Sequence, residues 1–251
     1  MFSLPAVRGV IDRRILVNFR VDPAELQAAL PGPFRPMTVG GYGVGGICLI
    51  RLTDVRPRGF PAFLGTRSEN AAHRIAVEWD DEADGETKTG VYVPRRDTSS
   101  NLTTLFGGRV FSSEHHQATF TVAERDDRYE VTMESDDAEA RVHVAGSVTD
   151  SLPDESVFDS VAAASEFFQR GSLGYSPSKA GDEYDGIELE TYEWSVTPMA
   201  VERVASSYFE DDGRFSGVEF DCALLMRDID HEWRQREPIC WPEPDEIAAA
   251  D

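Results

Sequence analysis

The sequence predicts a single, mainly β domain whose antiparallel strands close into a barrel or sandwich. Three observations lead to this prediction: many short segments alternate apolar and polar residues, turn residues separate these segments at short spacing, and helical patterns are few. The length of 251 residues suits one all-β domain, and the 41% of hydrophobic residues are enough for a sizeable core. We therefore expect one domain over residues 1–251.

The strand pattern is clearest near the N-terminus. Apolar residues occupy alternate positions from Arg14 to Val21, and the same alternation recurs from Ala71 to Trp79. Each pattern predicts a half-buried strand, because neighbouring side chains of a strand point to opposite faces. Comparable strand patterns cover residues 90–93, 118–122, 129–134, 140–148, 189–196, 201–209 and 218–226.

Three segments predict helices. Asp22, Pro23 and Glu25 supply an N-cap, an N1 proline and a capping-box acid for a helix that ends at Leu30. The other two helices are expected at residues 99–106, closed by a glycine, and at residues 157–169, where apolar residues follow helical spacing.

Two further segments have distinctive compositions. The glycine-rich residues 40–46 lack a phosphate-loop signature, so we expect a strand or bend with closely approaching backbone there. Residues 170–186 are rich in Gly, Ser, Pro and Asp, which predicts one long connection of the kind that often serves as a lid.

The charge is strongly negative. Acidic residues number 46 against 24 basic ones, for a formal net charge of -22. Such a surface repels nucleic-acid phosphates and anionic lipids, so we expect neither nucleic acid nor membrane as a partner. No apolar signal core or membrane-length apolar run is present, which predicts a cytoplasmic protein. The dispersed acidic excess fits a halophile, while the scarcity of lysine fits either a halophile or a biased genomic composition.

Three cysteines, Cys48, Cys222 and Cys240, are widely spaced and form no C-x-x-C pair. This pattern favours neither a disulfide framework nor a cysteine zinc site, so buried free thiols are expected.

The order of several motifs carries a family resemblance. After the N-terminal strand come VDPAELQAALPGPF, the VRPRGFP turn, the strand with Glu69, then GVYVPRRDTSSNLTTLFGGRVF and a final HEW. This order resembles an uncharacterised branch, of unknown function, of the acetoacetate decarboxylase-like superfamily. The resemblance implies a strongly bent antiparallel sheet closed into a cone or barrel around an internal cavity.

The resemblance also sets this chain apart from true acetoacetate decarboxylases, whose Gly-x-Pro-Lys-Lys motif supplies a lysine that forms an imine with the substrate. Here Glu114, His115 and His116 fall about where that motif would supply its lysines, and the chain has only Lys88 and Lys179. Both lysines are flanked by carboxylates that favour the ammonium form. Imine chemistry is therefore not expected.

Residues 106–118 hold the main candidate site. We expect Glu69 with His115 or His116 to act as general acid and base, and Arg109, with Glu114, to bind the substrate. The ordinary alternatives are a histidine hydrogen-bonded in a polar turn, a surface carboxylate for Glu69 and a structural ion pair for Arg109. Neighbouring histidines of a strand point to opposite faces, so a shared metal is disfavoured.

A metal site would need Glu69, His73, one of His115 and His116, and His143, but no H-x-H or H-E-x-x-H spacing supports it. The sequence demands no metal and no cofactor. The leading function is an enzyme-like pocket for a small oxo or carboxylate compound. The alternatives are a non-catalytic small-ligand-binding barrel and a protein whose surface serves homo-oligomeric assembly.

Overall fold

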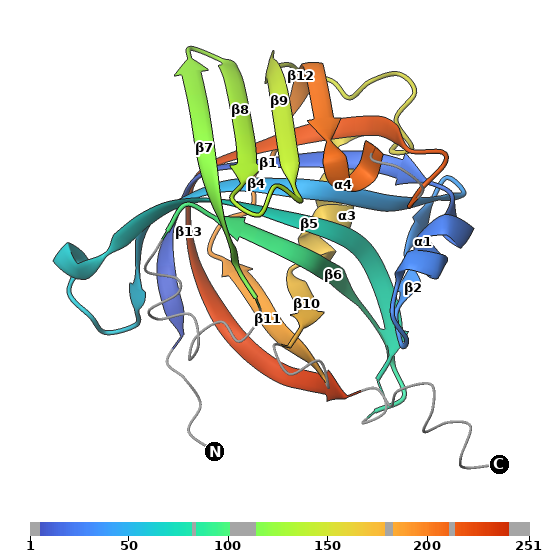
Figure 1. Cartoon of the computed structure of the whole chain (residues 1–251), viewed down its shortest axis with the longest axis horizontal. Coiled ribbons are helices and arrows are strands. Elements are labelled where there is room, and N and C mark those ends of the chain that lie inside the picture. Colours follow the sequence, from blue (N-terminus) through green and yellow to red (C-terminus); the bar gives the residue numbers. More distant parts are fainter. Residues whose placement is uncertain (1–5, 82–83, 101–113, 179–182, 211–213, 241–251) are drawn as a thin grey trace.

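The computed structural model describes residues 6–81, 84–100, 114–178, 183–210 and 214–240. Within these residues, 13 strands form one sheet that curves strongly around the molecule (Figure 1). The strands are β1 (Val7–Val21), β2 (Arg35–Pro36), β3 (Thr38–Val39), β4 (Tyr42–Pro57), β5 (Thr66–Asp80), β6 (Thr87–Thr98), β7 (His116–Arg125), β8 (Arg128–Ser135), β9 (Arg141–Val148), β10 (Leu173–Pro177), β11 (Glu183–Thr191), β12 (Thr197–Ser206) and β13 (Glu219–Cys240). The helices are α1 (Pro23–Ala29), α3 (Val161–Arg170), α4 (Ser207–Glu210) and the 3-10 turn η1 (Ala62–Leu64).

The strand pairings close two rings that share a wall. One ring runs through β1, β4, β5, β6, β10, β11 and β13, because β6 pairs with β10 and β11 pairs with β13. The other runs from β6 through β7, β8, β9 and β12 back to β13. Strands β13, β1, β4, β5 and β6 belong to both rings and form the shared wall. The expected mainly β fold, a strongly bent sheet that closes on itself, is confirmed.

The middle of β1 and of β5, in the shared wall, is buried on both faces, which corrects the prediction that these two strands are half-buried. Residues 15–19 of β1 and 73–77 of β5 are all buried. Ile15 and Val17 pack into one hydrophobic core with β8 and β9, whereas Leu16 packs into a second core with α3. Successive side chains of these strands therefore point alternately into two cores, and neither face is in contact with solvent there.

Side chains cap the first turns of α1 and α3. Asp22 accepts a hydrogen bond from the Ala24 backbone N–H, as expected for an N-cap, but Glu25 accepts hydrogen bonds from Ser216 instead of closing a capping box. Helix α3 starts at Val161, four residues after the predicted start, because the Ser160 hydroxyl caps it.

The segment ahead of α3 is held by tertiary contacts. The Val157 backbone N–H donates to Asp221 at 2.7 Å, and the Phe158 ring packs against Phe167 and Phe168 of α3. The predicted helix at residues 99–106 lies outside the described residues from position 101 onward.

The predicted long connection at residues 170–186 was wrong over much of its length. Strand β10 and the start of β11 lie there, with Tyr175 buried in the core. Two predicted strands are displaced towards the N-terminus: β11 ends at Thr191 instead of residue 196, and β12 begins at Thr197 and gives way to α4 at Ser207. The polar composition of residues 170–186 gave no strand pattern, although β10 and β11 complete the ring between β6 and β13.

The glycine-rich segment has the structure expected of it. Gly40 and Gly41 adopt positive φ angles of 59° and 87° in the turn between β3 and β4. In β4, a Cβ on Gly45 would lie 2.7 Å from the Phe209 ring, and one on Gly46 would collide with the Val17 carbonyl oxygen. Cys48 and Cys222 are buried free thiols as expected, but Cys240 is exposed. No helix among the described residues is long and apolar enough to cross a membrane.

Candidate functional site

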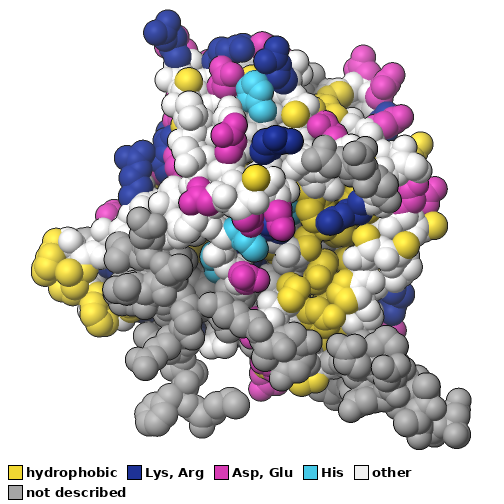
Figure 2. Space-filling view, in the orientation of Figure 1, with side chains coloured by type: hydrophobic (Ala, Val, Ile, Leu, Met, Phe, Trp, Pro, Cys, Tyr) yellow, Lys and Arg dark blue, Asp and Glu magenta, His cyan; other side chains and the backbone are white. Residues whose placement is uncertain are grey.

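A cavity of about 100 Å³ lies where β6, β7 and β10 meet. It brings together two of the residues predicted from sequence, Glu114 and His116, with two neighbouring arginines of β6, Arg95 and Arg96. The remaining lining residues are Val93, Pro94, Ser176, Pro177 and Ser178. Figure 2 shows histidine and acidic side chains gathered near the centre of this face, over the start of β7.

His116 is oriented by a carboxylate. Its Nδ1 lies 2.9 Å from Oδ2 of Asp137 in the turn between β8 and β9. Burial works to raise the pKa of Asp137, but hydrogen bonds from Ser135, the Glu139 N–H and Arg95 outweigh it and hold that pKa well below its usual range. An ionised Asp137 accepts a hydrogen bond, so it holds the imidazole proton on Nδ1. In the neutral ring of that tautomer, Nε2 carries the free lone pair.

Arg95 and Arg96 are neighbours on β6 and point to opposite faces of the strand. Arg95 is paired with Asp97 at 2.9 Å, Asp137 at 2.8 Å and Glu139 at 3.2 Å. Burial works to raise the pKa of Asp97, and the Arg95 pair opposes that shift only in part.

Arg96 differs from its neighbour in lacking an acidic partner. Its Nε donates to the Ser176 hydroxyl at 3.2 Å, and it forms no ion pair within the described part of the chain. The Arg96 side chain is only partly exposed, and burial of its guanidinium lowers the pKa to about 10. A buried guanidinium without a carboxylate is suited to holding the anionic group of a ligand.

Glu69 lies in a separate cluster of ion pairs. Its two carboxylate oxygens bind Arg13 at 2.6 Å and Arg51 at 2.5 Å, and both arginines also reach Glu124 of β7. Arg51 additionally pairs with Asp12 at 3.0 Å. Arg13 is fully buried, so Glu69 and Glu124 supply the charge that offsets it. Arg227 also lies 3.7 Å from Glu124, so the cluster joins three arginines to three carboxylates.

The strand register relates this cluster to His116. Ala71 of β5 lies opposite Asp97 of β6, and Asp97 lies opposite His116 of β7. Glu69 is two residues from Ala71 and shares its face of β5. Glu69 and His116 therefore lie on one face of the sheet, two strands apart; Glu69 pairs with Arg13 and Arg51, whereas His116 pairs with Asp137.

The remaining predicted site residues and the two lysines lie outside this cluster or outside the described residues. His115 is described and precedes β7, whereas Arg109 lies outside the described residues. Lys88 is partly exposed near the start of β6 and pairs with Asp84 at 2.7 Å and Glu86 at 2.8 Å, which raise its pKa. Such a lysine is the opposite of an activated amine nucleophile. Lys179 lies outside the described residues.

The histidines considered for a metal are dispersed. His73 is buried beside Tyr208, with ring centroids 4.9 Å apart, and His143 lies on β9 with Nε2 at 3.0 Å from Glu130. Burial lowers the pKa of His73 to about 3. Across the described ranges, no three His, Cys, Asp or Glu side chains come together in a way that suits a metal ion.

Sequence reasoning missed the residues that complete the cavity. The one available signal was the pair Arg95 and Arg96 inside a strand pattern, which places one arginine on each face of the wall. Asp137 and Ser176 carried no local signal, because their positions depend on which strands pair across the rings.

Comparison with solved structures identifies the fold of this chain. Acetoacetate decarboxylase from Legionella pneumophila subsp. pneumophila is similar to it with a TM-score of 0.58 and 12% identity, over 95% of this chain and 90% of that one. The enduracididine biosynthesis enzyme MppR complexed with pyruvate is similar with a TM-score of 0.63 and 11% identity, over 96% and 91%. The fold of this chain is therefore acetoacetate decarboxylase-like.

The family follows from the sequence. The DUF2071 family model, described as an uncharacterised conserved protein, matches residues 11–220. The chain therefore belongs to the DUF2071 family, an uncharacterised branch with the acetoacetate decarboxylase-like fold. A search of curated proteins found no match.

Proposed function

We propose that this protein binds a small oxo acid in the cavity between β6, β7 and β10 and catalyses proton transfer on it without forming an imine. The observation that carries the proposal is Arg96, a guanidinium that lines the cavity together with His116 and forms no ion pair among the described residues. Guanidinium geometry suits two parallel hydrogen bonds to a carboxylate.

His116 supplies the chemistry in this proposal. Asp137 holds the Nδ1 proton, so Nε2 of a neutral imidazole takes a proton from the carbon next to the ligand's carbonyl and returns it. Glu114 lines the same cavity and is the second candidate acid. Glu69, bound by Arg13 and Arg51, stands two strands away on the same face and is assigned an indirect role in holding that face together.

Pyruvate is the probe of choice, because MppR, which shares the fold, was solved as a complex with pyruvate. We expect the protein to bind pyruvate in calorimetry and to exchange its methyl protons in D₂O, followed by proton NMR. Arg96→Gln is expected to weaken binding roughly 10- to 100-fold through loss of a charge-assisted hydrogen bond. His116→Gln is expected to slow exchange roughly 100-fold or more while binding is retained.

The matched control is Arg128→Gln, which removes an exposed arginine paired with Glu202 on the far strands β8 and β12 and should change neither quantity. Borohydride added with pyruvate should leave no covalent adduct. Exchange that persists in His116→Gln, or an adduct on either lysine, contradicts the proposed chemistry.

A non-catalytic binding role is the second candidate, and the same Arg96 supports it, because an unpaired guanidinium holds an anion with or without turnover. Binding that depends on Arg96 with no proton exchange above background would select this role. Absence of Arg96-dependent binding would reject both.

A further inference from the structure

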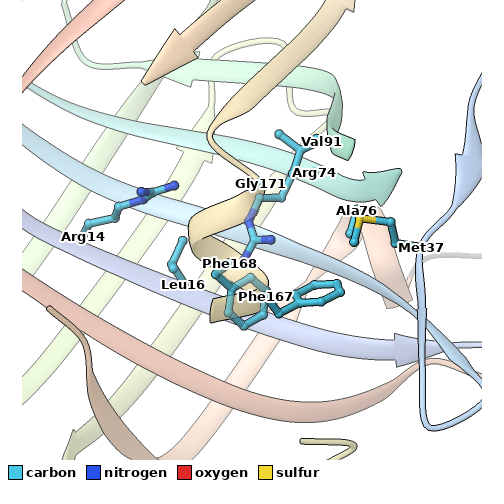
Figure 3. Close-up of a pocket in the computed structure, with 10 residues that line it drawn as sticks. Arg14, Leu16, Met37, Arg74, Ala76, Val91, Phe167, Phe168 and Gly171 are labelled. Carbon is cyan, nitrogen blue, oxygen red and sulfur yellow. The ribbon is translucent and has the colours of Figure 1, made fainter. Parts of the chain in front are cut away.

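A second cavity lies on the other side of the shared wall, against helix α3. It has a volume of about 30 Å³ and is lined by Arg14 of β1, Arg74 of β5 and the last turn of α3 with Phe167 and Phe168. Figure 3 shows both arginine side chains extending toward the C-terminal end of α3. This cavity shares no lining residue with the Arg96 cavity.

Arg74 is buried without an acid. It is 4% exposed, its guanidinium stacks 5.0 Å over the Phe168 ring, and it donates to the side-chain oxygen of Asn18. Its Nε is buried and has no hydrogen-bond partner. A buried charge normally has an opposite charge beside it, because burial removes its hydration. Burial and the charge of Arg14 lower the pKa of Arg74 to about 10.

Arg14 adds a second positive charge to the same cavity. Its Nε donates to the sulfur of Cys48 at 3.2 Å, and its Nη1 lies 3.9 Å from the sulfur of Met226. Thioether and thiol sulfurs are both uncharged and accept hydrogen bonds only weakly. Neither Arg14 nor Arg74 forms an ion pair with any carboxylate in the described ranges.

The neutral neighbours do not balance these charges. The C-terminal end of α3 carries a partial negative charge of about half an elementary charge. Half an elementary charge is a minor part of the negative charge needed to balance two guanidinium groups. The missing component is therefore an anion.

We propose that the cavity between Arg14, Arg74 and the C-terminal end of α3 binds a chloride ion. A volume of about 30 Å³ has room for on the order of two water-sized species. That space is suited to a monatomic halide and too small for a carboxylic acid of metabolic size. The bound chloride joins α3 to β1 and β5, so it stabilises the folded chain.

The test is the melting temperature at constant ionic strength, with sodium chloride replacing sodium gluconate, whose anion is too large for the cavity. Chloride at ten times its dissociation constant should raise the melting temperature by roughly 3–6 °C in a chain of this size. Arg74→Gln should abolish this chloride-specific rise. Arg35→Gln, which removes an exposed arginine paired with Asp80 at 2.9 Å, should retain it.

Crystals of the unmodified protein soaked in sodium bromide provide a second measurement that does not depend on a variant folding. A bromide anomalous peak between the two guanidinium groups is expected. Equal melting temperatures in chloride and gluconate, or no bromide peak at this position, overturns the proposal. Because pyruvate binding involves the separate Arg96 cavity, either proposal can fail without the other.

Discussion

At the scale of single residues, Glu69 helps to balance the charge of buried arginines with its carboxylate. It provides one of the two carboxylates that bind the fully buried Arg13, and it also binds Arg51. Removing one member of a buried ion-pair network leaves the others uncompensated. We expect Glu69→Gln to lower the free energy of unfolding by roughly 2–3 kcal/mol, since Glu124 still contacts both arginines.

Urea unfolding followed by fluorescence measures this loss. Glu202→Gln is the control, because Glu202 and its partner Arg128 are both about half exposed, and such pairs contribute at most about 1 kcal/mol. Equal losses in the two variants would show that the Glu69 network contributes no more than a surface ion pair.

The burial of His73 predicts how the free energy of unfolding changes in mild acid. Burial lowers its folded-state pKa to about 3, below the ordinary 6.5, so only the unfolded chain takes up the proton between these values. The associated stability is complete above pH 6.5 and is lost as the pH falls below it. From pH 6.5 to pH 5 the loss is about 2 kcal/mol for one such histidine.

The variant His73→Gln cannot take up that proton. Its free energy of unfolding should therefore fall less steeply between pH 6.5 and pH 5 than that of the unmodified chain, whatever its stability at neutral pH. His143→Gln removes a histidine at the surface of β9 and should keep the slope that His73 contributes. Identical slopes in all three proteins would contradict the burial of an uncharged His73.

The candidate site was predictable at this scale only in part. Sequence position was enough to nominate Glu114 and His116, which the structure brings into one cavity. It was not enough to separate them from Glu69, because the network with Arg13 and Glu124 joins residues 56 and 111 positions apart. Contacts that depend on ring closure leave no local pattern in the sequence.

At the scale of elements, helix α3 shows what local signals determine. The Ser160 hydroxyl accepts a hydrogen bond from the Ala163 backbone N–H at 3.1 Å and sets the first residue of the helix. We expect Ser160→Ala to cost about 1 kcal/mol of stability, measured by urea unfolding. Ser151→Ala, at an exposed position outside the helix, should cost nothing measurable. A cost below about 0.3 kcal/mol at Ser160 would mean that packing of Phe167 and Phe168 alone determines where α3 begins.

Most strands were predictable from alternation, and the reason for the failures is physical. Alternation reports that two faces differ, so it identified β1 and β5 but did not reveal that both of their faces are buried. The prediction placed β10 and the start of β11 in a loop, because their polar and glycine residues are stabilised by partners from β6 and β13. Composition reflects local preference, whereas these strands depend on distant partners.

At the scale of the whole molecule, the dominant property is the net charge of -22. Many acids are neutralised locally in pairs with arginine, but the excess is spread over the surface and repels itself in dilute buffer. At about 1 M salt the screening length falls to about 3 Å, which removes most of this repulsion. We therefore expect the melting temperature to rise when ionic strength increases from dilute buffer to molar salt.

Sodium gluconate is the appropriate salt for this measurement, because it screens surface charge without filling a chloride site. A rise in gluconate reports the self-repulsion of the acidic surface. Any additional rise when chloride replaces gluconate at the same ionic strength reports the cavity of Arg14 and Arg74. A melting temperature indifferent to gluconate would refute adaptation to high salt, since the surface charge would then impose no measurable cost on the compact state.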